Sequence, residues 1–206
     1  METNPEQPAA PDQQLPVPAP DSPVLETPPA KPSPAGVAGV VFAIGMALLG
    51  GLLGILGALA QEIRGAGALG PFLGGPVIEE ALKPVGLYIL LIWWPQLVSK
   101  RLPTACLAAL SGLSFGLIES TIYLFVYVPH HTHAFFVFRY TVDVAVHTLC
   151  SFIVGLGINR SLIDSAMGRI PFLQGSRRYY VTAILIHAGF NVTVTVLDVT
   201  GVLRLR

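Results

Sequence analysis

Long apolar runs dominate the chain after residue 35, and each is interrupted only by a few polar positions. A helix needs about 20 apolar residues to cross a bilayer, and five runs reach that length. They cover approximately residues 35–60, 72–97, 103–128, 135–158 and 179–199. The pattern therefore predicts an all-α integral membrane protein, built as a bundle of about five transmembrane helices.

The first 35 residues have a different character. They contain eleven prolines, five acidic residues and a single lysine, and no apolar run. A segment of this composition cannot bury enough apolar surface to fold on its own. We expect residues 1–35 to be a disordered, proline-rich tail, and residues 36–206 to form the membrane domain.

The composition of the chain is typical of a membrane protein, and the distribution of basic residues among its loops predicts its orientation. The chain is 52% hydrophobic and 12% charged, and its formal net charge is zero, which excludes nucleic acid as a partner. The loops after the second and fourth runs are rich in lysine and arginine. Because basic loops stay in the cytoplasm, we expect a multi-pass protein of the cell membrane with a cytoplasmic N-terminus.

The second run carries three charged residues, Glu79, Glu80 and Lys83, within otherwise apolar sequence. A charge inside a bilayer costs about 2.5–3.5 kcal/mol on insertion scales, so such groups pair, line a cavity or perform chemistry. Glu79 and Lys83 are four residues apart and should pair, whereas Glu80 points about 100° away and should lack a local partner. Pro84 should kink the helix beside these groups.

Polar residues in three later runs repeat every four positions, so each run should present one polar stripe to the bundle. The stripes are Phe115, Glu119 and Tyr123; Arg139, Asp143, His147 and Ser151; and His187 and Asn191. Counted from the side of the first loop, their acids and histidines lie roughly 5–18 Å deep. Four helices should therefore bring their polar groups to one layer of the membrane.

This layer can activate water in two ways. If Lys83 pairs with Glu79, and Arg139 with Asp143, as supporting groups, then Glu80 and Glu119 remain beside two histidines. Those four residues, Glu80, Glu119, His147 and His187, could hold one divalent metal such as zinc. Alternatively, no metal binds and a glutamate shares a proton with its neighbours. Asn191 could donate a hydrogen bond to an oxyanion in either case.

The motifs resemble those of the PrsW family of intramembrane proteases, within the superfamily of CAAX-processing and bacteriocin-processing proteases. The resemblance covers about residues 70–195. It rests on Pro76-Val-Ile-Glu79-Glu80-Ala-Leu-Lys83, on Gly112-Leu-Ser-Phe115-Gly-Leu-Ile-Glu119, on His147 after Arg139, and on His187-Ala-Gly-Phe-Asn191. It implies that Glu79 and Glu80 are the paired essential glutamates, with Glu119, His147, His187 and Asn191 as the other motif residues. It also implies a membrane-anchored protein substrate, an anti-sigma factor in PrsW proteins.

Two other interpretations concern function without catalysis. Acids and histidines inside a membrane can form the proton relay of a transporter, and a protease-like scaffold could keep the fold alone. Coupled transporters usually contain internal repeats, and the sequence has none. A scaffold would be expected to lose a catalytic group, and none is missing. The sequence therefore predicts an intramembrane endopeptidase that uses glutamate- and histidine-activated water.

Overall fold

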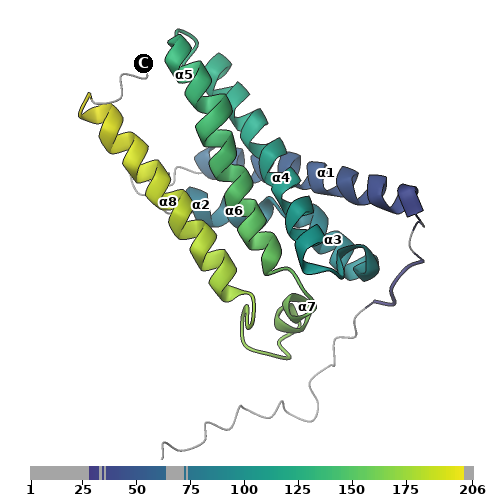
Figure 1. Ribbon diagram of the computed structural model, residues 1–206. Helices are drawn as coiled ribbons and strands as arrows, with labels where there is room; N and C mark the ends of the chain where they lie inside the picture. Colours follow the sequence, from purple (N-terminus) through teal and green to yellow (C-terminus); the bar gives the residue numbers. More distant parts are fainter. Residues whose placement is uncertain (1–27, 33, 35, 64–71, 73, 202–206) are drawn as a thin grey trace, which may run out of the picture.

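The computed structural model describes residues 28–32, 34, 36–63, 72 and 74–201, and among them it contains helices and no strands. Figure 1 shows α4, α6 and α8 running alongside one another, with α1 crossing behind them. The α-helices are α1 (Gly36–Ile63), α2 (Gly75–Leu82), α3 (Val85–Trp93), α4 (Arg101–Ile122), α5 (His133–Phe138), α6 (Val144–Leu156), α7 (Ser161–Ala166) and α8 (Arg177–Val199). The disorder expected for the tail falls mostly on residues outside those described.

The prediction of an all-α membrane protein is confirmed. Four of the five expected spans are helices long and apolar enough to cross a membrane. In the part of the chain that the structure describes, these are Gly36–Ala60, Arg101–Tyr127, His133–Leu156 and Arg177–Val199. The second expected span consists instead of two shorter helices, α2 and α3, so it crosses the bundle as a broken helix.

The break lies at Lys83 and Pro84, where the sequence predicted a kink. Pro84 has no amide hydrogen and its ring clashes with the preceding turn, so the helix cannot continue through it. The Ser111 hydroxyl on α4 donates a hydrogen bond to the Lys83 carbonyl oxygen. A polar side chain from a neighbouring helix thus satisfies a backbone group that the break would leave unpaired inside a membrane.

Glycines allow the helices around the break to approach closely. A Cβ atom on Gly54 of α1 would lie 3.1 Å from the Phe115 ring and 3.3 Å from Lys83 Cα. On α4, a Cβ atom on Gly116 would lie 3.3 Å from His147 Cβ. Small residues at these positions therefore bring α1, the break and the α4–α6 pair into direct backbone contact.

Gly112→Ala is expected to destabilise the protein by about 1–3 kcal/mol, because overpacking forces backbone shifts. Its added Cβ would lie 2.7 Å from Ser151 Cβ and closer still to the His147 carbonyl oxygen, so α4 must move away from α6. Thermal unfolding of the purified protein in detergent measures the loss. Gly45→Ala is the matched control, because nothing lies within 4 Å of its added Cβ. Equal stability of the two variants would contradict the close α4–α6 packing.

Two of the spans contain a π-helical turn, which the sequence pattern did not predict. These turns are η3 (Tyr123–Tyr127), after α4, and η4 (Arg139–Asp143), between α5 and α6. The Arg139 guanidinium lies over the Tyr123 ring, 4.1 Å from its centroid, so the two turns face each other. Such turns often mark functional sites, and η4 carries two charged residues of the polar network described below.

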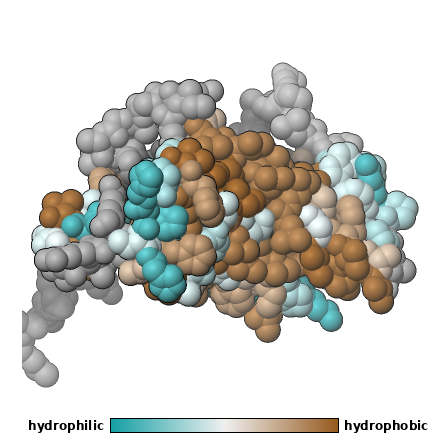
Figure 2. Space-filling view, turned by 90° about the horizontal axis from the view of Figure 1, so that it is seen from above, coloured by the Kyte–Doolittle hydropathy of each residue, from teal (hydrophilic) through white to brown (hydrophobic). Residues whose placement is uncertain are grey.

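The outside of the helix bundle is apolar. Figure 2 shows hydrophobic side chains over most of the described surface on the face in view. Large apolar side chains that are exposed include Val40 and Leu52 on α1, Val77 on α2, and Leu185 and Val196 on α8. A surface of this kind matches a protein whose helices face lipid.

Candidate active site

Charged and imidazole side chains from several helices form one continuous network inside the bundle. All of its members are buried except Glu119, which is partly exposed. The members are Glu79 and Glu80 of α2, Lys83 at the break, Glu119 of α4, Arg139 and Asp143 of η4, His147 of α6 and His187 of α8. The structure thus brings together five of the six residues predicted to be catalytic and all three predicted to support them.

Glu80 and Lys83 form the most deeply buried pair of the network, and both side chains are fully inaccessible. The Lys83 ammonium donates to Glu80 Oε1 at 2.7 Å and lies 3.5 Å from Glu79 Oε2. The prediction that Glu80 lacks a local partner is therefore wrong. Residues three apart also lie side by side on a helix, and Lys83 uses that spacing for its shorter contact.

His187 of α8 reaches both glutamates of α2. Its Nδ1 atom lies 2.9 Å from Glu80 Oε1, and its Nε2 atom lies 3.7 Å from Glu79 Oε2. An ionised carboxylate only accepts hydrogen bonds, so His187 Nδ1 carries the proton and donates to Glu80. In the neutral ring the Nε2 lone pair is then directed towards Glu79.

His147 of α6 connects the two halves of the network through its two ring nitrogens. Lys83 Nζ lies 2.8 Å from Nδ1, and Glu119 Oε2 lies 3.0 Å from Nε2. An ammonium group only donates, so Nδ1 accepts from Lys83 and the ring proton sits on Nε2, which donates to Glu119. The two histidine rings are nearly perpendicular, with their centroids 4.8 Å apart.

Arg139 holds the acids on the other side of His147. Its Nη2 atom lies 2.9 Å from Glu119 Oε2 and 3.2 Å from Asp143 Oδ2, which confirms the predicted Arg139–Asp143 pair. Ser120 donates to the Arg139 carbonyl oxygen at 3.0 Å. Sequence reasoning overlooked Ser120, because it lies beside the polar stripe of its helix rather than on it.

The network contains a set of donor atoms that suits a divalent metal. Glu79, His147 and His187 each offer one ligand atom, and these atoms lie within 4.8 Å of one another. A carboxylate with two imidazoles is a ligand set of catalytic zinc sites. Glu79 Oε2 and Glu80 Oε2 are buried without a hydrogen-bond partner among the described residues. Acceptor atoms left in this state fit a site built for a cation.

Each histidine of this set also donates a hydrogen bond from its other ring nitrogen to a carboxylate. Glu80 accepts from His187, and Glu119 accepts from His147. Carboxylates in this position fix the tautomer and orientation of metal-binding histidines. A second set, made by Glu119, Asp143 and His147, also has suitable spacing. A protein cation lies beside each set, Lys83 at the first and Arg139 at the second. The first set is the one that combines two imidazoles with a carboxylate, as catalytic zinc sites do.

The remaining predicted residues lie around this centre. Asn191 is half-buried on α8, one turn after His187. Phe115 is fully buried, and its ring packs both under the Lys83 ammonium, at 4.2 Å, and against His147. Ser151 is buried one turn after His147. The predicted polar stripes therefore do face the inside of the bundle.

Comparison with known proteins identifies one family. The sequence model of the PrsW family intramembrane metalloproteases matches residues 33–205, which is most of the chain. No curated protein and no solved structure matches.

Proposed function

The chain belongs to the PrsW family of intramembrane metalloproteases, and from that premise we propose that it hydrolyses a peptide bond of a membrane-anchored protein at the centre described above. One observation carries this proposal. Glu79, His147 and His187 come from three separate helices, yet their ligand atoms lie within 4.8 Å of one another in a buried position. Burying three such groups together inside a membrane is costly unless they act together.

Three residues of this chain would hold the metal. They are Glu79 through Oε2, His147 through Nδ1 and His187 through Nε2, the ring nitrogens that carry no proton in the hydrogen-bond pattern above. A bound divalent metal such as zinc supplies Lewis acidity and makes water a nucleophile at neutral pH. Lys83 would have to release His147 Nδ1, and it can remain on Glu80.

Glu80 is the proton acceptor in this proposal. Its Oε1 atom is held by Lys83 and His187, and its Oε2 atom has no hydrogen-bond partner among the described residues. One oxygen of the carboxylate is therefore held in place, and the other is able to accept a proton, as a general base requires. Asn191 would donate a hydrogen bond to the carbonyl oxygen as negative charge develops on it.

The apolar outer surface and the family together support a substrate that is itself anchored in the bilayer. We propose an anti-sigma factor, the substrate that the resemblance to PrsW proteins implies. We also propose that the protein resides in the cell membrane with its N-terminus in the cytoplasm. The basic loops after α3 and α6 support this orientation.

Metal content and cleavage test the proposal together. The purified full-length protein in detergent should contain stoichiometric metal and should cleave a single-span substrate. Chelation should abolish cleavage, and adding the metal back should restore it. Cleavage by metal-free protein would refute the metal centre and leave a glutamate-dependent protease. Metal binding without cleavage of any membrane-anchored substrate would refute the endopeptidase.

A further inference from the structure

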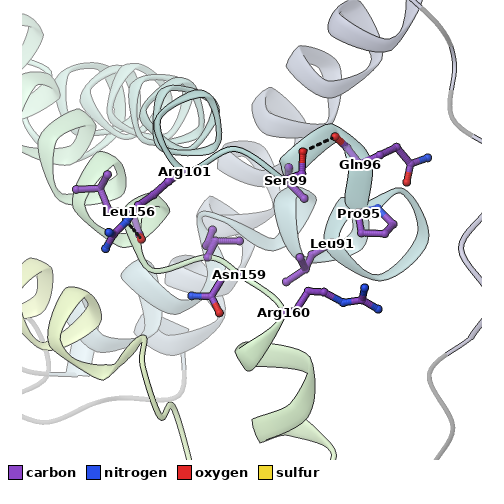
Figure 3. A pocket seen from close by; sticks show the side chains of 10 residues that line it. Leu91, Pro95, Gln96, Ser99, Arg101, Leu156, Asn159 and Arg160 are labelled. Atoms are coloured by element: carbon purple, nitrogen blue, oxygen red, sulfur yellow. Dashed lines mark hydrogen bonds between the residues drawn. The ribbon is translucent and has the colours of Figure 1, made fainter.

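A pocket of about 660 Å³ lies at the end of the bundle where α3 and α6 end and α4 begins, away from the catalytic centre. It is a half-open pocket, lined by the end of α3, the following turn η2 (Pro95–Val98), the start of α4 and the loop after α6 (Figure 3). Leu156 on its wall lies nine residues after His147 on one helical segment, about 13 Å along the axis. The pocket is thus separate from the site of hydrolysis.

The lining of the pocket combines apolar and basic side chains. Leu91, Leu156 and Ile158 are among its lining residues, together with the exposed Arg101 and Arg160. No aspartate or glutamate is among its described lining residues. A cavity that combines hydrocarbon with uncompensated positive charge is complementary to an anionic amphiphile.

The two arginines differ in how they are held. Arg101 donates through Nε to the Leu156 carbonyl oxygen at 2.9 Å, and its guanidinium lies 4.9 Å from the centroid of the Tyr179 ring. It is therefore fixed while its terminal N–H groups stay available. For the exposed Arg160 side chain there is no ion pair or hydrogen bond to any residue that the structure describes. Arg160 can therefore bind a ligand without losing a partner.

The surroundings of the pocket place it at the level of the lipid headgroups. Trp93, Trp94 and Tyr179 lie at the same helix ends, and such aromatic residues concentrate where membrane meets water. Basic residues are also concentrated there: residues 95–101 and 156–178 contain six lysines and arginines but only one acidic residue, Asp164. The six are Lys100, Arg101, Arg160, Arg169, Arg177 and Arg178.

We propose that this pocket binds the phosphate headgroup of an anionic phospholipid. Arg160 binds the phosphate oxygens, Arg101 adds positive charge on the side of the pocket next to Leu156, and the first part of an acyl chain lies along the apolar lining (Figure 3). Guanidinium groups suit this role because they bind phosphate oxygens in a bidentate manner. Basic pockets between transmembrane helices bind lipid headgroups by the same physics.

Native mass spectrometry of the full-length protein in detergent, titrated with phosphatidylglycerol or phosphatidylcholine, tests the proposal. Phosphatidylglycerol should bind more tightly, and Arg160→Gln should weaken its binding about fivefold. Ser99→Trp should abolish the binding without changing any charge, because Ser99 is exposed and lines the pocket. Arg177→Gln is the matched control, since it removes the same charge at the same end of the bundle but outside the pocket.

Three results would overturn the proposal. Equal weakening by Arg177→Gln and Arg160→Gln would mean a general attraction to the basic surface. Unchanged binding in Ser99→Trp would place the lipid elsewhere. Displacement of phosphatidylglycerol by equimolar inorganic phosphate would make the free ion the ligand rather than the lipid. The readout is independent of peptide hydrolysis, so it also stands if the protein proves to have no protease activity.

Discussion

Glu79→Gln is expected to lose bound metal and cleavage together, whereas Glu80→Gln should keep the metal at saturating concentration and still lose cleavage. Glu79 belongs to the set of possible metal ligands with the two histidines. Glu80 instead contacts His187 Nδ1 through Oε1, and its Oε2 atom has no hydrogen-bond partner among the described residues. Loss of a general base lowers rates by about 10²- to 10⁴-fold. Loss of a carboxylate behind a metal-binding histidine weakens metal affinity by about 10- to 100-fold.

The measurement pairs metal content per protein molecule with the rate of cleavage of a single-span substrate. His147→Ala and His187→Ala should behave like Glu79→Gln, and all variants should still insert into the membrane. Asp164→Asn is the matched control, because it removes one carboxylate charge from a partly exposed ion pair far from the centre. If Glu79→Gln kept its metal and Glu80→Gln lost it, the two roles would be exchanged.

Lys83→Met is expected to produce the largest loss of stability, about 3–5 kcal/mol, because breaking a buried ion pair leaves an uncompensated charge. The Lys83 and Glu80 side chains are both fully inaccessible, and their charged atoms lie 2.7 Å apart. Thermal unfolding of the protein in detergent measures the effect. Lys100→Met is the matched control, since Lys100 is exposed in the loop before α4.

A double variant separates the ion pair from a simple packing effect. If the unpaired Glu80 carboxylate causes the loss, then Lys83→Met with Glu80→Gln should be more stable than Lys83→Met alone. With Glu80→Gln measured alone as well, the coupling between the two side chains is the stability change of the double variant minus the sum of the changes of the two single variants. A double variant that is no more stable than the single one would show that the lysine acts through its other contacts, such as that of its ammonium with the Phe115 ring, rather than through its pair with Glu80.

The sequence could predict that the charged residues of several helices come together, because an unpaired charge inside a membrane is costly. The four-residue spacing of Arg139, Asp143 and His147 defined one helix face, and the structure places all three in the network. Their depth followed from counting residues along spans that alternate in direction. These arguments need only the helical repeat and the bilayer thickness, so they hold without knowledge of tertiary packing.

Choices between neighbouring partners could not be predicted in this way. Lys83 can reach Glu79 or Glu80 by helix geometry alone, and it lies closer to Glu80 while also reaching His147 of another helix. The grouping of Glu79, rather than Glu80 or Glu119, with both histidines likewise depends on how α2 packs against α6 and α8. The sequence therefore indicated Glu80 and Glu119 as the candidate metal-binding glutamates, whereas the structure places Glu79 with the two histidines.

The broken second span also affects how the protein can be made. As an eight-residue helix, α2 is about 12 Å long, well short of the bilayer thickness, and it carries two carboxylates that no translocating machinery would readily release into lipid by themselves. His187, which accommodates both, is synthesised more than a hundred residues later. We therefore expect α2 to reach its final position only after α8 has been made, so that formation of the contacts between α2 and α8 completes the folding of the membrane domain.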